Sequence, residues 1–388
     1  MLGEIALARV RRTFNLPVKP ALATLNVTDR CNCRCLMCDV HAREAGSELS
    51  EREWAALFRD PVMSRLRVVR ITGGEPFLRD DLCGIFLAAA GNAPGRVVQV
   101  TTNGSLPGRV RDFLDLTRRS NAEVKLQISL DALGKKHDKT RGVDGLFERV
   151  METAEIAAGR ARRGLSVGIN QTVIEANMDE IEAVGRFARE RGFGHNVILG
   201  AKYFEGAGRF DAGGGRLPFE PHAPLPREAL EGFYRLTSRL RREERPRRVR
   251  SGAWSAWLRD VSDEYLAEGG ANRLLRGTNS PMPPCTAMFN HFRALPGGGI
   301  TACSVFRSEP AGNLREGTMG EIWNSPGARR LRSKVRSCTG CWIECDVTPS
   351  AFFSGDVALW FLKKLFSDPG FAGAYVHPRW ILRAIRGG

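Results

Sequence analysis

The sequence lacks any apolar run long enough to span a membrane. A spanning helix needs roughly 18 consecutive apolar residues, and the chain contains no such run. The N-terminal stretch MLGEIALARVRRTF has one short apolar run followed by arginines, without a small-residue cleavage site. This order is wrong for a secretory signal. The sequence therefore predicts a cytoplasmic protein.

Acidic residues are scarce relative to basic ones. The chain carries 43 Asp and Glu against 58 Lys and Arg, which gives a formal net charge of +15. This surplus fits either a basic solvated surface or an anionic partner, such as a phosphorylated substrate, an anionic membrane surface or RNA. Hydrophobic residues make up 43% of the chain, which supports a sizeable core and excludes general disorder.

Cysteine is also scarce, and its distribution is uneven. Of ten cysteines, four fall in RCNCRCLMCD (30–39) and five fall between residues 285 and 345. In a reducing compartment, clustered cysteines indicate metal ligands rather than disulfides. The remaining Cys83 lies in DDLCGIF, on an apolar helix face, where we expect a packed core thiol.

Strand-like and helix-like segments alternate from residue 21 to residue 201. A capping box of Ser50 and Glu53 predicts a helix start after the first strand. Repeated strand–helix units predict a parallel sheet covered by helices. The expected fold class is therefore α/β, with an open, partial (βα)6 barrel as its closure. The expected strands are 21–28, 67–73, 96–104, 123–132, 165–173 and 195–201.

Four polar motifs follow the expected strands at the same end. The cysteine cluster follows the first strand, and GGEP (73–76), TTNG (101–104) and SLD (129–131) close the next three strands. Catalytic groups of parallel βα barrels lie on loops after the carboxyl ends of the strands. The four motifs therefore predict one site at that end of the barrel.

Cys31, Cys35 and Cys38 have the spacing C-x3-C-x2-C. Three thiolates on a short loop can hold three irons of a cubane 4Fe–4S cluster and leave the fourth iron open. A structural zinc site would instead require four protein ligands. Cys33 is a poor candidate for that fourth ligand, because alternating cysteines do not converge easily on one small ion. We expect Cys33 to be a bystander in the loop.

The cysteine spacing after the first strand and GGEP after the second resemble the radical S-adenosylmethionine (SAM) superfamily, and the resemblance covers residues 22–201. It implies that the amino and carboxylate groups of SAM chelate the open iron. It also implies that an electron from the reduced cluster splits SAM, and that the resulting 5′-deoxyadenosyl radical abstracts a hydrogen atom from the substrate. The protein binds, orients and excludes water, while the cofactor carries the chemistry.

The same resemblance implies a set of SAM-binding residues. GGEP holds the methionine amino group, because its glycines allow close backbone approach and Glu75 supplies an acceptor. Ser129 and Arg141 bind the SAM carboxylate, and Asp131 orders that loop or contacts ribose. Met37, at a position that is usually aromatic, offers an apolar surface to adenine. The full set is Gly73, Gly74, Glu75, Pro76, Thr102, Asn103, Ser129, Asp131, Arg141 and Met37.

Five further cysteines lie in the C-terminal part, where a glycine run at 297–299 predicts a hairpin. A structural zinc knuckle is one interpretation. The spacing C-x17-C then C-x2-C, with Gly298 five residues before the second cysteine, resembles instead the auxiliary-cluster domains SPASM and Twitch. The resemblance implies one auxiliary 4Fe–4S cluster, with Cys345 replacing one ligand or standing nearby. The expected ligands are Cys285, Cys303, Cys338 and Cys341.

These expectations divide the chain into five parts. They are an N-terminal extension (1–21), a radical SAM core barrel (22–201), a basic helical linker (202–280), a small α+β auxiliary-cluster domain (281–346) and an amphipathic C-terminal tail (347–388). The tail mixes bulky apolar and basic residues. It fits either a helix that caps the barrel or an interfacial helix on an anionic membrane, so association with a membrane surface stays open.

The resemblance implies an enzyme of oxidoreductase or transferase type that completes a net oxidation or coupling, because an auxiliary cluster can accept the electron left after hydrogen abstraction. Its expected partners are a reductant such as flavodoxin or ferredoxin and an anionic small-molecule, lipid-linked or peptide substrate, but not nucleic acid. No catalytic acid or base is assigned. The alternative is a non-catalytic iron–sulfur or zinc module that binds RNA, against which GGEP, Ser129 and Arg141 argue.

Overall fold

The chain folds around one large sheet, and the computed structural model describes residues 12–44, 46–91, 95–201, 221–250, 254–338 and 342–375. Its strands are β1 (Leu22–Thr28), β2 (Val68–Gly73), β3 (Val97–Thr102), β4 (Glu123–Ser129), β5 (Leu165–Val173), β6 (Gly194–Leu199), β7 (His291–Ala294), β8 (Gly299–Thr301) and β9 (Gly312–Asn313). Within the described ranges they form a nine-stranded sheet in the order β6-β5-β4-β3-β2-β1-β7-β8-β9. β1 to β6 pair in parallel, which confirms the expected α/β partial barrel.

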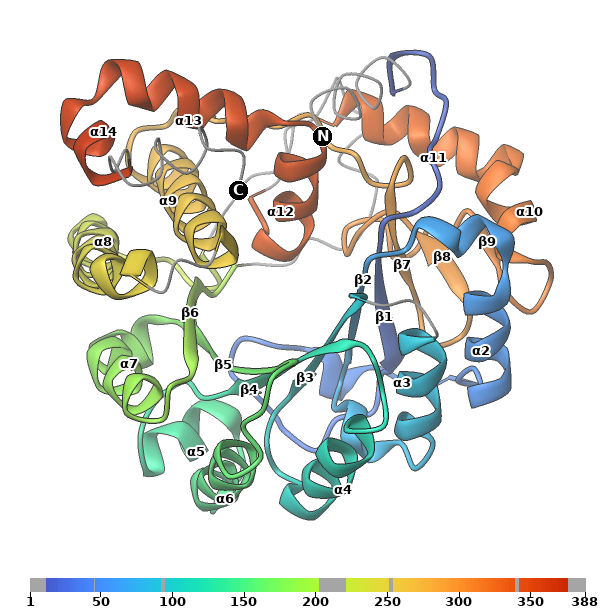
Figure 1. Ribbon diagram of the computed structural model, residues 1–388, viewed down its shortest axis with the longest axis horizontal. Helices are drawn as coiled ribbons and strands as arrows, with labels where there is room; N and C mark the ends of the chain where they lie inside the picture. The colour runs from blue at the N-terminus through green and yellow to red at the C-terminus, as the bar shows by residue number, and fades with distance from the viewer. Residues whose placement is uncertain are drawn as a thin grey trace.

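Helices connect the parallel strands and cover the outer face of the sheet (Figure 1). They are α2 (Glu51–Arg59), α3 (Leu82–Ala90), α4 (Pro107–Thr117), α5 (Lys135–Arg141), α6 (Leu146–Ala158) and α7 (Ile181–Glu190). The predicted capping box is confirmed, because the Ser50 side chain accepts from the backbone N–H of Glu53 and the Glu53 side chain accepts from that of Ser50. Such a cap satisfies N–H groups that the first helical turn leaves without partners.

Alternate residues of each barrel strand face opposite sides. On β1, Ala23, Leu25 and Val27 are fully buried in the outer core, whereas Thr24 and Asn26 line a cavity inside the barrel. This follows from the two-residue period of a strand. The same alternation on the next three strands places polar side chains in the lumen, namely Arg70, Thr72, Gln99, Thr101, Lys125 and Gln127. The barrel therefore has an apolar outer layer and a polar interior.

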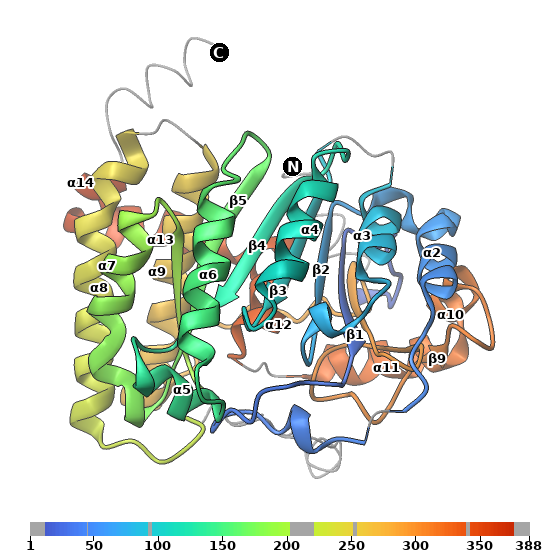
Figure 2. The ribbon, with the colours of Figure 1, turned by 90° about the horizontal axis from the view of Figure 1, so that it is seen from below.

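The C-terminal half extends and closes the barrel. Its helices are α8 (Arg227–Arg250), α9 (Trp254–Leu275), α10 (Met319–Asn324), α11 (Pro326–Ser337), α12 (Glu344–Phe353), α13 (Asp356–Ser367) and α14 (Pro369–Tyr375). α8 and α9 lie beside β6, and β7–β9 extend the opposite edge of the sheet (Figures 1 and 2). β7 pairs in parallel with β1, so the auxiliary region continues the barrel sheet. The predicted hairpin is confirmed between β7 and β8.

The last helices pack on α9. Tyr265 and Trp342 belong to one buried cluster with Trp360, and the Tyr265 hydroxyl donates to Asp356 over 2.7 Å. The tail thus packs on α9, and its interpretation as a helix that caps the barrel stays a prediction. The far side of α13 leaves Leu359 and Phe366 exposed. Among the described residues, none of the helices is long and apolar enough to cross a membrane.

Candidate active site and cluster-binding loops

The cysteine-rich loop follows β1 directly, as the motif order predicted. Cys33 is 2% exposed and belongs to the main core, whereas Cys31, Cys35 and Cys38 are more accessible. The Asn103 side-chain amide donates to the Cys33 sulfur over 3.1 Å. Cys33 therefore faces inward and anchors the loop, while the three cysteines of the C-x3-C-x2-C spacing stand on its more open side.

The end of α5 supports this loop from the other side. The backbone N–H groups of Arg34 and Leu36 donate to the carbonyls of Arg141 and Thr140, over 2.9 and 3.0 Å. Gly142 ends the helix with a φ of +67°, and a Cβ atom at this position would lie 2.5 Å from the Arg34 carbonyl oxygen. Only glycine fits both the left-handed backbone and this close contact.

GGEP packs its backbone against the same loop. The N–H groups of Gly74 and Glu75 donate to the carbonyls of Thr28 and Arg30. A Cβ atom would lie 2.2 Å from the Thr28 oxygen at Gly73 and 2.1 Å from the Arg30 oxygen at Gly74. Both glycines are thus required for the approach of the two loops, which are the ones expected to hold the cluster and SAM.

Glu75 connects the loops after β2 and β3. Its carboxylate is 1% exposed and accepts from the Phe77 N–H, the Thr102 hydroxyl and the Asn103 N–H, over 3.0, 2.9 and 2.6 Å. Burial raises the pKa of Glu75 to about 7, although these hydrogen bonds oppose the rise. Pro76 follows at the first position of a short 3-10 turn, where its missing N–H costs nothing. The expected contact of Glu75 with SAM stays a prediction.

Asp131 and Arg141 form a buried ion pair at the end of β4. Arg141 Nε donates to Asp131 Oδ2 over 2.6 Å, and Arg141 Nη1 lies 3.8 Å from Cys35 Sγ. Asp131 Oδ1 also accepts from the backbone N–H of Thr172. Burial alone would lower the pKa of Arg141, but Asp131 and Cys35 raise it. Asp131 thus orders the loop, and Ser129 lies buried two residues before it.

The donor set of the loop fits an iron–sulfur cluster. Among the described residues, no three His, Cys, Asp or Glu side chains are placed to hold a single metal ion. A cubane is larger than an ion, and thiolate sulfur is the donor that it requires. Hydrogen bonding with Cys33 lowers the pKa of Cys31 to about 6 and that of Cys35 to about 7. Both cysteines therefore favour the thiolate that binds iron, whereas burial raises the pKa of Cys38.

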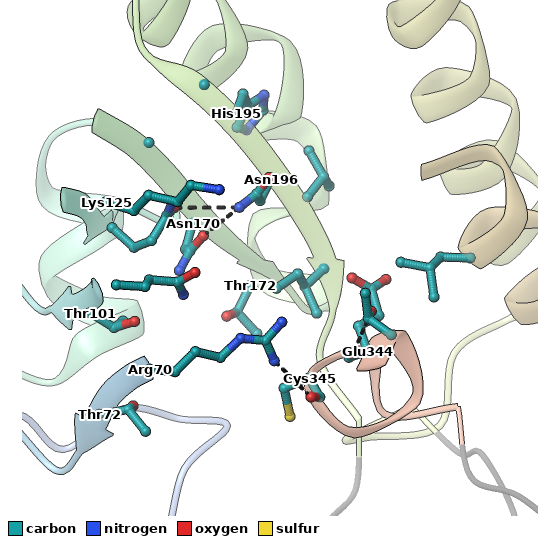
Figure 3. Close-up of a pocket in the computed structure, with 18 of the residues that line it drawn as sticks. Arg70, Thr72, Thr101, Lys125, Asn170, Thr172, His195, Asn196, Glu344 and Cys345 are labelled. Atoms are coloured by element: carbon teal, nitrogen blue, oxygen red, sulfur yellow. Dashed lines mark hydrogen bonds between the residues drawn. The ribbon is translucent and has the colours of Figure 1, made fainter. Parts of the chain in front are cut away.

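A cavity of about 1000 Å³ occupies the barrel and reaches the cysteine loop. Met37, which is 9% exposed, and Cys38 line it together with Gly73 and Thr101. Residues of β1 to β7, α8, α9 and the start of α12 also line it. Figure 3 shows Arg70, Lys125 and Asn170 directed into this space from three strands. The cavity can therefore hold a polar substrate beside the cluster loop.

The C-terminal cysteines separate into two places. Cys285, Cys303 and Cys338 line one small, mostly apolar cavity, where burial raises the pKa of Cys285. Three thiols without histidine suit an iron–sulfur cluster. Cys341, the expected fourth ligand, lies outside the described residues. Cys345 lines the large barrel cavity instead, and burial raises its pKa to about 11.

Arginines join the auxiliary region to the barrel lumen. Arg70 Nη1 donates to the Cys345 carbonyl over 2.9 Å (Figure 3). Arg293 donates from Nη1 to Asn26 Oδ1 over 2.9 Å and from Nη2 to Asp346 Oδ1 over 3.0 Å. Sequence reasoning assigned no role to these arginines. Both arginines lie at inward-facing positions of their strands. These positions indicate residues that line the cavity only once the strand register is known.

Comparisons with known proteins agree with this geometry. Residues 25–188 match the model of the Radical SAM superfamily, and residues 285–342 match that of SPASM, an iron–sulfur cluster-binding domain. A Fe-coproporphyrin III synthase of Methanosarcina barkeri is 31% identical over 44% of this chain and 41% of its own length. A GTP 3′,8-cyclase of Campylobacter jejuni is 33% identical over 43% of this chain and 52% of its own length.

Solved structures show the same fold. SuiB of Streptococcus suis, in a crystal structure with bound S-adenosylmethionine, superposes with a TM-score of 0.57 and 16% identity, over 86% of this chain and 75% of its own. The two curated relatives match over only about half of their length or less. Residues 25–188 thus form a radical SAM domain, and residues 285–342 form a SPASM iron–sulfur domain. Its cofactors are accordingly a 4Fe–4S cluster, SAM and an auxiliary iron–sulfur cluster.

Proposed function

We propose that the chain is an enzyme that cleaves SAM reductively and abstracts a hydrogen atom from a substrate in the barrel cavity. The observation that carries this proposal is the convergence of the cysteine loop, GGEP and the Asp131–Arg141 pair at one end of that cavity. When bound and reduced, the cluster supplies the electron that splits SAM into methionine and a 5′-deoxyadenosyl radical.

The residues of the chain orient SAM. Arginine carries five N–H donors, and Arg141 uses only some of them on Asp131 and Cys35, so its guanidinium can still bind the SAM carboxylate. Gly73 and Gly74 bring their backbone close to the cysteine loop, where it can bind the amino group. Met37 covers the cavity wall beside Cys38 and can pack on adenine. Ser129, Thr102 and Asn103 are buried.

We infer that the auxiliary cluster exchanges electrons with the substrate in the barrel cavity. We infer that Cys285, Cys303, Cys338 and Cys341 hold it, and that Cys345 stands nearby rather than among its ligands. The segment with Cys345 and Asp346 contacts the barrel through Arg70 and Arg293. Removal of the electron left on the substrate would complete a net oxidation or a coupling. We also propose that the chain is divided into an N-terminal extension, a core barrel, a linker, an auxiliary-cluster domain and a C-terminal tail at the boundaries given above.

The substrate is an anionic small molecule, a lipid-linked metabolite or a peptide, and a flavodoxin- or ferredoxin-type reductant supplies the electrons. The similar proteins differ in this respect, since one makes Fe-coproporphyrin III, one cyclises GTP, and SuiB has been solved with its precursor peptide SuiA. Similarity therefore supports the shared chemistry. The residues that line the barrel cavity of this chain must determine which substrate it binds.

The decisive experiment is anaerobic reconstitution followed by reduction and addition of SAM. The wild-type chain should form 5′-deoxyadenosine, and Cys35→Ala should abolish it because the cluster loses a ligand. Cys33→Ser is the matched control in the same loop and should retain activity, because serine keeps a hydrogen-bonding group beside Cys31, Cys35 and Asn103. An intact cluster without any 5′-deoxyadenosine would reject the proposal in favour of a non-catalytic iron–sulfur module.

A further inference from the structure

One row of paired residues crosses the barrel sheet and carries three cations. In the strand register, Thr24 pairs with Arg293 on one side and Arg70 on the other, and Gln99 joins Arg70 to Lys125. Residues paired in this way point to the same face of a sheet, and all five line the barrel cavity. The barrel interior thus contains a positively charged belt. It consists of Arg293, Arg70 and Lys125 and lies before the C-terminal ends of the strands.

The cations of this belt differ in their partners. Arg293 pairs with Asp346, and Arg70 donates to the Cys345 carbonyl. Lys125 makes no hydrogen bond and no ion pair anywhere in the described part of the chain. A charged group that is partly removed from water without a partner is costly. Lys125 is partly buried. The described residues therefore do not offset the cost of its burial with an ion pair or a hydrogen bond.

A second cation approaches Lys125 from outside the sheet. Arg259 of α9 lines the same cavity and likewise makes no ion pair with any described residue. It reaches the sheet because β6 begins with glycine: a Cβ atom at Gly194 would lie 3.0 Å from Arg259 Nη1. Gly194 in turn pairs with Gly168 of β5. Gly194 therefore leaves room for Arg259, whereas the space beside Gly168 is filled by the Gln127 side chain.

The electrostatics agree with this placement. The pKa of Lys125 is lowered, first by burial and then by the charge of Arg259; the charge of Glu123 opposes this shift, and that of Arg70 adds to it. Acidic residues also line the cavity, among them Glu244 and Glu344, but neither pairs with these cations. Glu244 is instead bound by Arg189. Glu123 offsets part of the repulsion between Lys125 and Arg259, and an anion between the two cations would relieve the rest.

We propose that Lys125 and Arg259, with Arg70 beside them, bind an anionic group of the substrate, a phosphate or a carboxylate. The inference rests on the proposed function and names its substrate class. Lys125 and Arg70 lie in the N-terminal half of their strands, and Arg259 of α9 approaches Gly194 at the start of β6, whereas the cluster loop follows the C-terminal end of β1. The anionic group is therefore held at the far end of the cavity, and the carbon that loses hydrogen extends toward the cluster loop. The three residues are positioning residues for that carbon.

The test is a calorimetric titration of the reconstituted, SAM-saturated chain with inorganic pyrophosphate, and in a second arm with succinate. Saturation with SAM keeps either probe from the open iron. The wild-type chain should bind one of the two probes, and the preferred probe separates a phosphate site from a carboxylate site. Lys125→Gln and Arg259→Gln should each weaken its binding about tenfold, as expected for lost hydrogen bonds to a charged group. Lys125→Arg should restore most of it.

Two surface variants serve as matched controls. Lys135 and Arg242 are exposed and do not line the cavity, so Lys135→Gln and Arg242→Gln remove the same charges and should leave binding unchanged. Equal affinity in all variants, or no binding of either probe by the wild-type chain, overturns the inference. The titration needs neither reductant nor turnover, so this result is distinct from a failure of SAM cleavage, which would overturn the proposed function alone.

Discussion

Arg141 and Asp131 form an ion pair with almost no exposure to solvent, and the exposed fractions of their side chains are 11% and 0%. The pair lies directly beside the cysteine loop, because the other end of the guanidinium approaches Cys35. A buried pair of this kind costs several kcal/mol when one partner is lost. It therefore fixes the orientation of Arg141 beside Cys35, where we propose that Arg141 binds the SAM carboxylate.

Asp131→Asn tests this relationship. It keeps the shape of the side chain but removes the charge that orients Arg141, so SAM should bind about tenfold more weakly. Titration of the reconstituted chain with SAM measures the effect. Asp115→Asn is the control, since Asp115 pairs with Arg160 on the surface and such pairs contribute little. Equal SAM affinity in both variants would remove Arg141 from the proposed site.

An iron assay should distinguish Cys33 from the other three cysteines of the first loop. Cys31→Ala, Cys35→Ala and Cys38→Ala should each lower the iron content by about one cluster, since three thiolates are the minimum for an open cubane. Cys33→Ser should retain the iron, because its sulfur is buried and engaged by Asn103. Loss of iron in Cys33→Ser together with retention in Cys31→Ala would show that the ligand set was assigned wrongly.

The close approach of GGEP to the cysteine loop predicts a large effect of one methyl group. Gly74→Ala would place a Cβ atom 2.1 Å from the Arg30 carbonyl oxygen, so it should lower the free energy of unfolding by about 1–3 kcal/mol and displace the loop. Gly108→Ala is the control, because a Cβ atom there meets nothing within 4 Å. Urea titrations of both variants give the comparison, and equal midpoints would contradict the packing described here.

Much of this site could be predicted from the sequence, because its motifs are local. The spacing of Cys31, Cys35 and Cys38 and the glycines of GGEP each carry their chemistry within a few residues. The order of strands and helices between residues 21 and 201 likewise predicted the barrel correctly. The capping box at Ser50 and the hairpin around Gly298 are further local signals that the structure confirms.

The contacts between distant segments could not be predicted. The pairing of β7 with β1 joins residues more than 260 positions apart, and no local pattern specifies it. The belt of Arg293, Arg70 and Lys125 exists only through the register of five strands. In the sequence, nothing distinguishes Cys345 from the other C-terminal cysteines. In the structure, α12 begins one residue before Cys345 and directs it toward the barrel.

Cys345 lies apart from the other described C-terminal cysteines, and this gives a further prediction. Cys303→Ala should lower the iron content by about one cluster, because Cys303 lines the small auxiliary cavity with Cys285 and Cys338. Cys345→Ala should retain the iron, since Cys345 lines the barrel cavity. Iron and sulfide assays on the two variants decide the matter. Equal loss of iron in both would place Cys345 among the cluster ligands.

Buried His137 predicts acid sensitivity. Burial, and then the nearby charge of Arg141, lower its pKa to about 3, while its Nδ1 accepts from the Asp131 N–H over 3.1 Å. The unfolded chain has the ordinary pKa of about 6.5. The stabilising contribution of neutral His137 is thus complete above pH 6.5 and is lost by up to about 1.4 kcal/mol per pH unit as the pH falls toward 3.

His137→Asn keeps an acceptor for the Asp131 N–H and cannot be protonated in this range. Urea unfolding at pH 7.5 and pH 5.5 should therefore show a smaller loss of stability in the variant than in the wild-type chain. His291, whose pKa burial also lowers to about 3, leaves part of the acid sensitivity in place. An identical loss in both proteins would show that His137 is not held neutral in the fold.

The most direct test of the account is the electron paramagnetic resonance spectrum of the reduced, reconstituted chain before and after SAM is added. If Cys31, Cys35 and Cys38 hold a cluster with an open iron, SAM should change the g values of its signal, and Cys35→Ala should lack both the signal and the change. A spectrum of that cluster that stays the same at saturating SAM would contradict the open iron on which the proposed function depends.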